Sequence, residues 1–287
     1  MIDRNIERLI TEALAIEALE AKEAGALGFI ARALTLATMP HRQVDTNEFQ
    51  RTNGAFTLSM LAPSKVGLPY GSIPRLLMAW LTTEAVKTRE RELVLGDSMS
   101  EFMRQLDLVP TGGRWGSIPR LKEQSKRLFA SSVTCIYSDS EQDALINIRV
   151  VKNAHLWWSP KNPEQASLWK STVTLSEEFF EEAIRNPVPV DMRALKALKR
   201  SPMALDIYTW MTYRMSYLRH PVEIPWQALQ GQFGADYAED TQGVRNFRRK
   251  FLNHLTKVLV VYPEAKVSEG NIGLSLKPSR PHVAKLR

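Results

Sequence analysis

Residues 241–262 read TQGVRNFRRKFLNHLTKVLVVY, and this stretch decides the fold that we expect for the chain. Its apolar residues recur at steps of three and four, which predicts an amphipathic helix capped by Thr241. They are Val244, Phe247, Phe251, Leu255 and Val258. A solvated helix face normally mixes acidic with basic side chains for i,i+4 pairing, but this stretch has no Asp or Glu. The helix is therefore expected to face a polyanion.

The segments around this helix predict the order of elements of a winged-helix domain. In such a domain a helix, a strand and two more helices precede a pair of strands, and the recognition helix enters the major groove of DNA. We expect a helix from Ser201, a strand over 222–224, a short helix over 226–233, a loop over 234–240, the helix from Thr241, and strands over 259–262 and 272–276.

The same order of elements is predicted between residues 71 and 151. It consists of a helix from Ser72, an extended segment over 92–95, a helix capped by Asp97 or Ser98, a turn over 111–113, a helix from Ser117, and strands over 133–137 and 145–151. When the halves are superposed, Trp80 aligns with Trp210 and Leu121 with Phe247. Identity between the halves is low, so chance matching of apolar residues stays open as the alternative to a duplication.

We therefore predict an α+β, mostly helical fold with two tandem winged-helix domains and an N-terminal helical extension. The expected divisions are 1–54 for the extension and its linker, 55–170 for the first winged-helix domain, and 171–287 for the second domain with its basic C-terminal tail. Within the extension we expect an amphipathic helix over 3–24, a second short helix over 28–38 and a polar linker over 41–54.

The charge of the chain is unevenly distributed. The net charge is +7, yet residues 1–48 hold five Lys and Arg against eight Asp and Glu, and residues 242–287 hold ten against two. This asymmetry indicates a C-terminal half that faces a polyanion. No apolar run is long enough to span a membrane, no signal-peptide core is present, and the single Cys135 favours a reducing cytoplasm.

The predicted helix from Thr241 carries side chains that can read DNA bases. Arg can bridge the O6 and N7 atoms of guanine and Asn the N6 and N7 atoms of adenine, while other basic residues bind phosphates. The candidates outside the apolar stripe are Arg245, Asn246, Arg248, Arg249, Lys250, Asn253 and Lys257. Lys266, in the strand pair that follows, is expected to lie along the adjacent backbone or minor groove.

The equivalent helix of the first half is also basic. Its candidates for DNA contact are Arg114, Arg120, Lys122, Lys126 and Arg127, with Glu123 alone opposing them. Two interpretations stay open: this helix touches phosphates, or it supports a dimer interface while the second domain reads the sequence.

Enzymatic motifs are absent from the sequence. No phosphate loop of the form GxxxxGK[ST] is present, the five histidines are isolated, and one cysteine cannot build a thiolate metal site. We therefore expect no enzyme, no cofactor and no metal. The Trp157, Trp158 and Trp169 cluster has two interpretations, stacking on single-stranded DNA or packing between the domains.

Three stretches resemble the plasmid-encoded RepA replication initiators. They are LPYGSIPRLLMAWLTTEAV from Leu68, RELVLGDSMSEFMRQL from Arg91 and PTGGRWG from Pro110. The run LKALKRSPMALDIYTWMTYR from Leu195 is similar to the first helix of the family's second domain, and ARALTLATMPHR from Ala31 also resembles the family. The resemblance extends over residues 26 to 275.

The resemblance implies a protein that binds repeated sites, called iterons, in double-stranded plasmid origin DNA. It further implies recruitment of the host initiator DnaA and the replicative helicase DnaB, and a switch between repressing homodimers and initiating monomers. Two alternatives stay open, a winged-helix transcriptional regulator and a partitioning protein that binds DNA of any sequence. The helix over 3–24 is expected to dock on the first domain, mediate dimerisation or bind the helicase loader.

Overall fold

The C-terminal third of the chain forms a helical unit closed by a three-stranded sheet. The computed structural model describes residues 8–10, 13–14, 16, 20–32, 35, 38–138, 143–156, 162–165, 170–234 and 237–284. The unit runs in the order α8 (Pro202–Tyr217), β10 (Val222–Pro225), α9 (Trp226–Phe233), α10 (Thr241–Val261), β11 (Val267–Glu269) and β12 (Gly273–Leu276). Strand β12 lies between β10 and β11 and is antiparallel to both.

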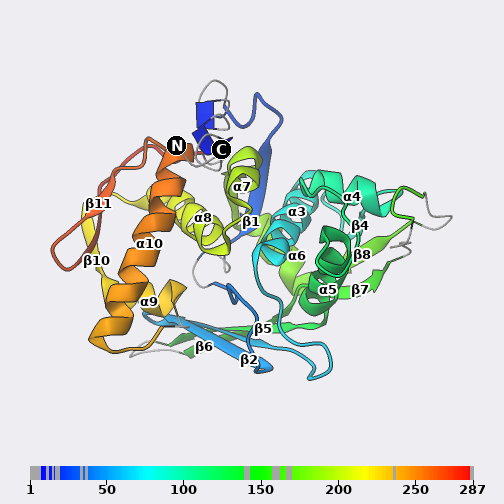
Figure 1. Ribbon diagram of the computed structural model, residues 1–287, viewed down its shortest axis with the longest axis horizontal. Coiled ribbons are helices and arrows are strands. Elements are labelled where there is room, and N and C mark those ends of the chain that lie inside the picture. The colour runs from blue at the N-terminus through cyan, green and yellow to red at the C-terminus, as the bar shows by residue number, and fades with distance from the viewer. Residues whose placement is uncertain are drawn as a thin grey trace.

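A second unit with the same order of elements and strands occurs earlier in the chain. It comprises α3 (Ser72–Thr88), β4 (Glu92–Val94), α4 (Met99–Gln105), α5 (Ser117–Ala130), β7 (Val151–His155) and β8 (Thr172–Leu175). Here β8 lies between β4 and β7, again with antiparallel pairing. The two units therefore agree both in the order of their elements along the chain and in the order of the strands within each sheet. Figure 1 shows α3 and α8 in the centre, with α10 to one side and α5 to the other.

The strand pair predicted to close the first unit belongs to a different sheet. Strands are present as β5 (Ser132–Ser138) and β6 (Asp143–Arg149), but β5 pairs with β3 (Phe56–Leu61), which pairs in turn with β2 (Glu48–Asn53). Leu58 and Met60 of β3 are fully buried. This hairpin is an insertion between α5 and β7, and β2 corrects the expectation of a linker over 41–54.

The N-terminal extension contains a strand where the sequence predicted a helix. Residues Leu27–Ala31 form β1, which pairs antiparallel with β9 (Pro187–Asp191), so the helix expected over 28–38 is wrong at its start. The run LGFIA is apolar, and its pairing partner lies far along the chain, from Leu27 opposite Asp191 to Ala31 opposite Pro187. Of the helix expected over 3–24, the described residues 8–10, 13, 14 and 16 are helical, but residues 21–25 form a turn, so the predicted end at residue 24 is wrong.

Two further helices flank strand β9. Helix α6 (Glu177–Arg185) begins after Ser176, whose hydroxyl accepts a hydrogen bond from the Phe179 amide at 3.1 Å. Helix α7 (Met192–Leu198) begins after Asp191, whose carboxylate accepts from the Arg193 amide at 2.8 Å. The architecture is therefore mixed α and β, with four small antiparallel sheets in the described part of the chain.

A buried ion pair joins the central helices of the two units. The Arg75 side chain of α3 donates from Nε and Nη2 to the two carboxylate oxygens of Asp206 in α8, at 2.7 and 2.6 Å. Arg75 also donates to the carbonyls of Met39, Pro40 and Gly71, and His41 Nε2 lies 2.8 Å from Asp206. Because both charged groups are buried, this network fixes α3 against α8.

Among the described residues no helix is long and apolar enough to cross a membrane.

Candidate nucleic-acid interface

Helix α10 begins one residue earlier than its sequence suggested and ends later. Asp240, not Thr241, is the cap: its carboxylate accepts a hydrogen bond from the Gly243 amide at 2.6 Å. The helix then runs to Val261, so the strand expected over 259–262 is wrong. Val258, Val261 and Tyr262 are all buried, and this three- and four-residue spacing continues the apolar stripe of the helix.

The apolar face of α10 is anchored by aromatic rings. The Phe251 ring lies 5.5 Å from Phe233 and 6.0 Å from Trp226, both on α9, and 5.5 Å from Phe247 on its own helix. Phe247 and Phe251 are fully buried. These contacts fix the rotation of α10 about its axis and thereby decide which side chains face outward.

Most of the predicted base readers lie on that outward face. Arg245, Arg249, Lys250 and Asn253 are exposed, and Asn246 and Lys257 are partly exposed. The Asn246 amide oxygen accepts hydrogen bonds from Gln242 Nε2 at 3.3 Å and from Arg249 Nη2 at 3.4 Å. Asn246 therefore links Gln242 and Arg249 on this face of the helix.

Arg248 occupies a different position from the other candidates. Its guanidinium forms an ion pair with Glu269 of β11 and lies 5.6 Å from the centroid of the Trp226 ring. Arg248 thus ties α10 to the sheet. Although the sequence of α10 contains no acidic residue, the folded chain places one beside it, because Glu269 of β11 pairs with Arg248.

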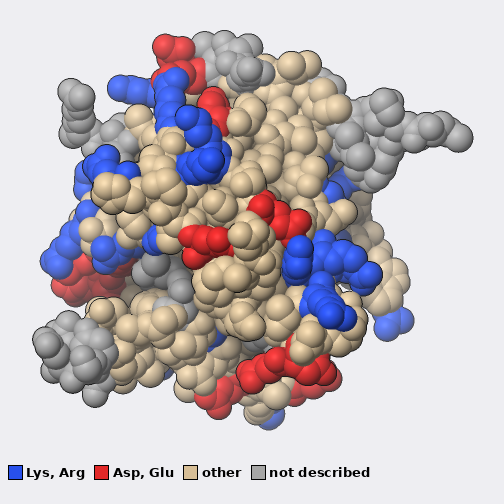
Figure 2. Space-filling model, turned by 90° about the vertical axis from the view of Figure 1, so that its left-hand side faces the viewer, with Lys and Arg blue, Asp and Glu red and all other residues tan. Residues whose placement is uncertain are grey.

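The turn between β11 and β12 forms an exposed tip beside α10. Glu223 of β10 holds it, because its carboxylate accepts hydrogen bonds from the amides of Ile272 at 2.7 Å and Gly273 at 2.9 Å. Ile272 is 65% exposed, and Lys266, just before β11, is also exposed. Figure 2 shows this side of the molecule, where Lys and Arg side chains form several groups with acidic side chains between them.

The basic residues of α5 divide into exposed and engaged side chains. Arg120, Lys122 and Lys126 are exposed on the helix. Arg127, in contrast, donates to Glu123 at 2.7 Å and to the Leu68 carbonyl at 3.1 Å, and it lies 5.3 Å from the Tyr70 ring centroid. Arg127 therefore fastens the segment before α3 and is poorly placed to reach DNA.

An exposed tryptophan precedes α5, and our sequence reasoning missed it as a candidate. Trp115 is 80% exposed, and the guanidinium of Arg114 lies 5.1 Å from its ring centroid. Its signal in the sequence was the turn PTGGRWG, in which a large aromatic residue stands among glycines. Trp157, Trp158 and Trp169, which the sequence did single out, lie outside the described residues.

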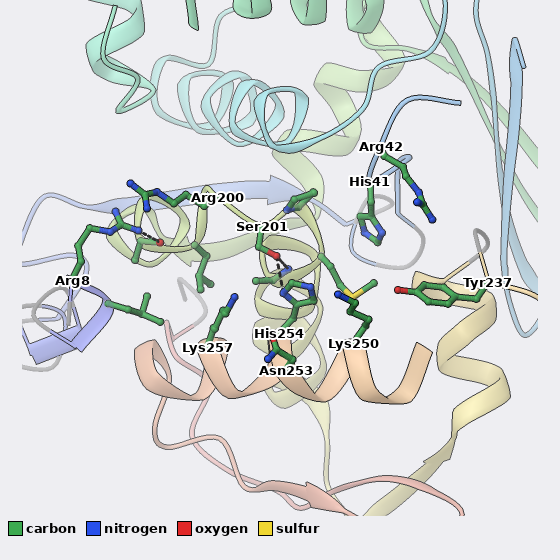
Figure 3. Close-up of a pocket in the computed structure, with 16 residues that line it drawn as sticks. Arg8, His41, Arg42, Arg200, Ser201, Tyr237, Lys250, Asn253, His254 and Lys257 are labelled. Atoms are coloured by element: carbon green, nitrogen blue, oxygen red, sulfur yellow. Dashed lines mark hydrogen bonds between the residues drawn. The ribbon is translucent and has the colours of Figure 1, made fainter. Parts of the chain in front are cut away.

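A cavity of about 580 Å³ adjoins α10 and adds residues that the sequence did not indicate. Lys250, Asn253 and Lys257 line it from α10, so three predicted base readers belong to it. Its other polar lining residues come from distant segments, as Figure 3 shows, and include Arg8, Arg42, Arg200 and Ser201. No cluster of three metal-ligating side chains occurs in the described part of the chain.

Comparisons with known proteins give one family and a structural neighbour. The model of the family described as plasmid-encoded RepA protein matches residues 68–226, more than half of the chain. This match is narrower than the resemblance over 26–275, and it ends before α10. No curated protein sequence matches.

Two crystal structures of RctB are similar to the chain. A crystal structure of RctB domains 2–3 has a TM-score of 0.50 at 11% identity and covers 85% of this chain and 96% of that one. A selenomethionine derivative of domains 2 and 3 has a TM-score of 0.53 at 11% identity, with 88% and 97% covered. At this identity the likeness concerns the fold alone.

Proposed function

The chain belongs to the family of plasmid-encoded RepA proteins, and from this premise we propose that it is a replication initiator that binds iterons in double-stranded origin DNA. The observation that carries the proposal is the outward face of α10. This helix of 21 residues exposes Arg, Lys and Asn side chains on its polar side, and Arg249 Nη2 lies 3.4 Å from the Asn246 amide oxygen. This is the residue chemistry that reads guanine and adenine in the major groove.

We further propose that each unit is a winged-helix domain, with boundaries near 55–170 and 171–287. Two observations support this division. The sheets β4–β8–β7 and β10–β12–β11 have the same strand order, and in each unit the first strand follows the first of three helices while the other two strands follow the third. The chain also matches nearly the whole of a structure that comprises two domains. In this scheme α10 is the recognition helix and the β11–β12 turn is the wing.

The two domains have different tasks in our proposal. Helix α10 reads bases through Arg245, Asn246 and Arg249, while Lys266 follows the backbone beside the wing. Helix α5 contributes Arg120, Lys122 and Lys126 to phosphates or supports a dimer. Recruitment of DnaA and DnaB, and a homodimer, are proposed from the family alone. The protein acts without catalysis or cofactor, in the cytoplasm, where its single cysteine stays a thiol.

A salt titration tests the initiator function. Affinity for duplexes containing repeats from the encoding plasmid is compared with affinity for random duplexes between about 50 and 200 mM salt. We expect binding to the repeats to stay tighter at every salt concentration, because base contacts add to phosphate contacts. Equal affinity for both duplexes at all salt concentrations would falsify the proposal.

Substitution of Arg249 tests the reading face. We expect Arg249→Ala to weaken binding to the repeats by about 1–3 kcal/mol, or about 5- to 150-fold, and to change binding to random DNA much less. Arg185→Ala is the charge-matched control, because Arg185 pairs with Glu181 on the exposed side of α6. If Arg249→Ala binds the repeats like the unmodified chain, α10 is not the reading helix.

One observation favours a second candidate function, a winged-helix transcriptional regulator. Regulators of this class respond to ligands, and the cavity beside α10 has the size of a small-molecule site. Maintenance of a plasmid that carries only the origin and this gene separates the two candidates. An initiator supports replication of that plasmid, whereas a regulator changes only the output of a promoter reporter.

A further inference from the structure

The cavity beside α10 is built from five separate segments of the chain, one of which, the loop between α9 and α10, contributes Tyr237. Figure 3 shows α10 along one side, with Lys250, Asn253, His254 and Lys257 projecting from it. The end of α7 and the start of α8 form the opposite wall with Arg200 and Ser201. The N-terminal helix adds Arg8, which donates to the Ala197 carbonyl at 3.1 Å, and the segment before β2 adds His41 and Arg42.

The charge of this lining is entirely positive. Five Lys and Arg line the cavity, and none of the described lining residues is acidic; the five are Arg8, Arg42, Arg200, Lys250 and Lys257. Within the described part of the chain, neither Lys250 nor Lys257 forms an ion pair or a side-chain hydrogen bond. The carboxylate behind His41, that of Asp206, is already paired with Arg75. Lys250 and Lys257 therefore have no protein counter-ion among the described residues.

His254 also lines the cavity, and its pKa responds to the positive charges around it. His254 Nδ1 lies 3.0 Å from the Ser201 hydroxyl oxygen. Burial, followed by the positive charges of Lys257, His41 when protonated, and Lys250, lowers the pKa of His254 to about 4. At neutral pH the imidazole is uncharged, so together with the hydroxyl it offers neutral hydrogen-bonding groups between the lysines.

We propose that this cavity is a phosphate-binding site, distinct from the base-reading face of α10. Lysine ammonium groups around a hydroxyl and an imidazole are the chemistry that holds a phosphate. A volume of about 580 Å³ lies within the range of small-molecule sites and accommodates more than one phosphate group. The phosphate comes either from a free phosphate-bearing ligand or from the backbone of a DNA strand that continues past α10.

The site adds a role for the N-terminal segment and for the C-terminal half of α10. Arg8 and Arg42 belong to segments outside both helical units, so a bound phosphate would draw these segments onto α10. The site goes beyond the proposed function, because binding of a phosphate there does not depend on which bases Arg245 and Arg249 contact.

The ring signals of His254 provide the test. The full chain, labelled with ¹³C-histidine and with His254 assigned through His254→Gln, is titrated with pyrophosphate at low ionic strength. We expect saturable shifts of the His254 signals and a rise in the pKa of His254, because the bound anion offsets Lys250 and Lys257. The same titration with a short duplex tests the DNA backbone as the source.

Lysine variants show where the anion binds. We expect Lys257→Gln and Lys250→Gln each to weaken pyrophosphate binding about tenfold, because each removes one charge-assisted contact. Arg185→Gln on α6 is the control and should bind pyrophosphate like the unmodified chain. Both lysine side chains reach solvent, so these variants should fold, which circular dichroism verifies.

The outcomes of these titrations identify the source of the phosphate or overturn the proposal. Saturable shifts with pyrophosphate support a free ligand, and shifts with duplex alone support the DNA backbone. The proposal is overturned if neither probe moves the His254 signals, or if both lysine variants bind like the unmodified chain. The Arg249→Ala experiment is independent of this test, because it measures the preference for one DNA sequence over another and not the binding of an anion near His254.

Discussion

Replacing Asp206 with Asn should strongly destabilise the chain, because it removes the counter-charge of a buried guanidinium. Arg75 is 7% exposed, and two of its nitrogens donate to Asp206 at 2.6 and 2.7 Å. In Asp206→Asn the amide nitrogen replaces one acceptor oxygen, so one guanidinium hydrogen bond is lost and a buried charge stays uncompensated. Breaking a buried pair in this way costs about 3–5 kcal/mol.

Urea unfolding followed by tryptophan fluorescence measures this loss. With a slope of about 3 kcal/mol per molar urea, a cost of about 3–5 kcal/mol lowers the midpoint by about 1–1.7 M. Glu164→Gln is the matched control, because its partner Arg104 is an exposed arginine at 3.4 Å. An exposed pair contributes about 0.2–1 kcal/mol at most, so that midpoint should move by no more than about 0.3 M.

The pH dependence of stability checks the same network independently. Burial acts to raise the pKa of Asp206, but the charge of Arg75 and the hydrogen bonds from His41 and Arg75 outweigh it and lower the pKa below its usual value. A lowered pKa in the folded state stabilises the fold above the unfolded value of about 3.9, and this contribution is lost as pH falls further. In Asp206→Asn, the loss of stability below about pH 4 should be shallower. If its midpoint matches that of Glu164→Gln at neutral pH, the assignment of the network is refuted.

Three further predictions concern α10 and the inserted sheet. Phe251→Ala should cost about 3–5 kcal/mol in urea unfolding, because the ring is fully buried against Trp226 and Phe233; a change under about 1 kcal/mol contradicts the packing. Gly243→Ala should cost about 1–3 kcal/mol and weaken DNA binding, because its Cβ would lie 1.8 Å from the Ala238 carbonyl oxygen, whereas Gly112→Ala, with nothing within 4 Å, should do neither. Cys135 should react with iodoacetamide at pH 8 at least about a hundredfold more slowly in the folded chain than in urea, because burial and then Glu182 raise its pKa to about 11; equal rates would contradict its burial.

The sequence predicted the helices of both units well because their signals are local. Ser98 is one of the two caps that the sequence indicated, and α3, α5 and α8 begin where Ser72, Ser117 and Ser201-Pro202 placed them. The apolar stripe of α10 also follows the predicted positions, because the helical period of 3.6 residues can be recognised from the sequence alone. The outward set Arg245, Asn246 and Arg249 follows directly from that stripe.

The sequence could not predict which strands pair. The segments 133–137 and 145–151 have the alternating pattern of a hairpin, and β5 does pair with β6. Nothing in this alternation indicates that β5 also pairs with β3. Strand β7 was missed because only Val151 of its residues is buried, which leaves no alternation to detect. The strand β1 has the same difficulty, since its partner Pro187–Asp191 is known only in the folded chain.

For the candidate site, too, the sequence predicted the positions on one helix but not the contacts between distant segments. A helix face can be predicted from one stretch, and all seven α10 candidates are exposed or partly exposed in the structure. The ion pair of Arg248 with Glu269 and the engagement of Arg127 with Leu68 depend on neighbours brought by folding. The cavity brings together Arg8, Arg42 and Arg200, which are far apart in the sequence and share no local motif, so the sequence could not predict it.

The inserted sheet explains why the two units need not act alike on DNA. Strand β2 packs against α9 of the second unit, where the Gly231 backbone comes so close that a Cβ would lie 3.1 Å from the Thr52 carbonyl oxygen. The β1–β9 pair and the Arg75–Asp206 ion pair add two further connections between the halves. With three such connections, the angle between α5 and α10 is set by protein contacts before DNA binds. In our proposal, phosphate contacts of the first unit then determine where the second unit lies on the duplex, so specificity does not require base reading by α5.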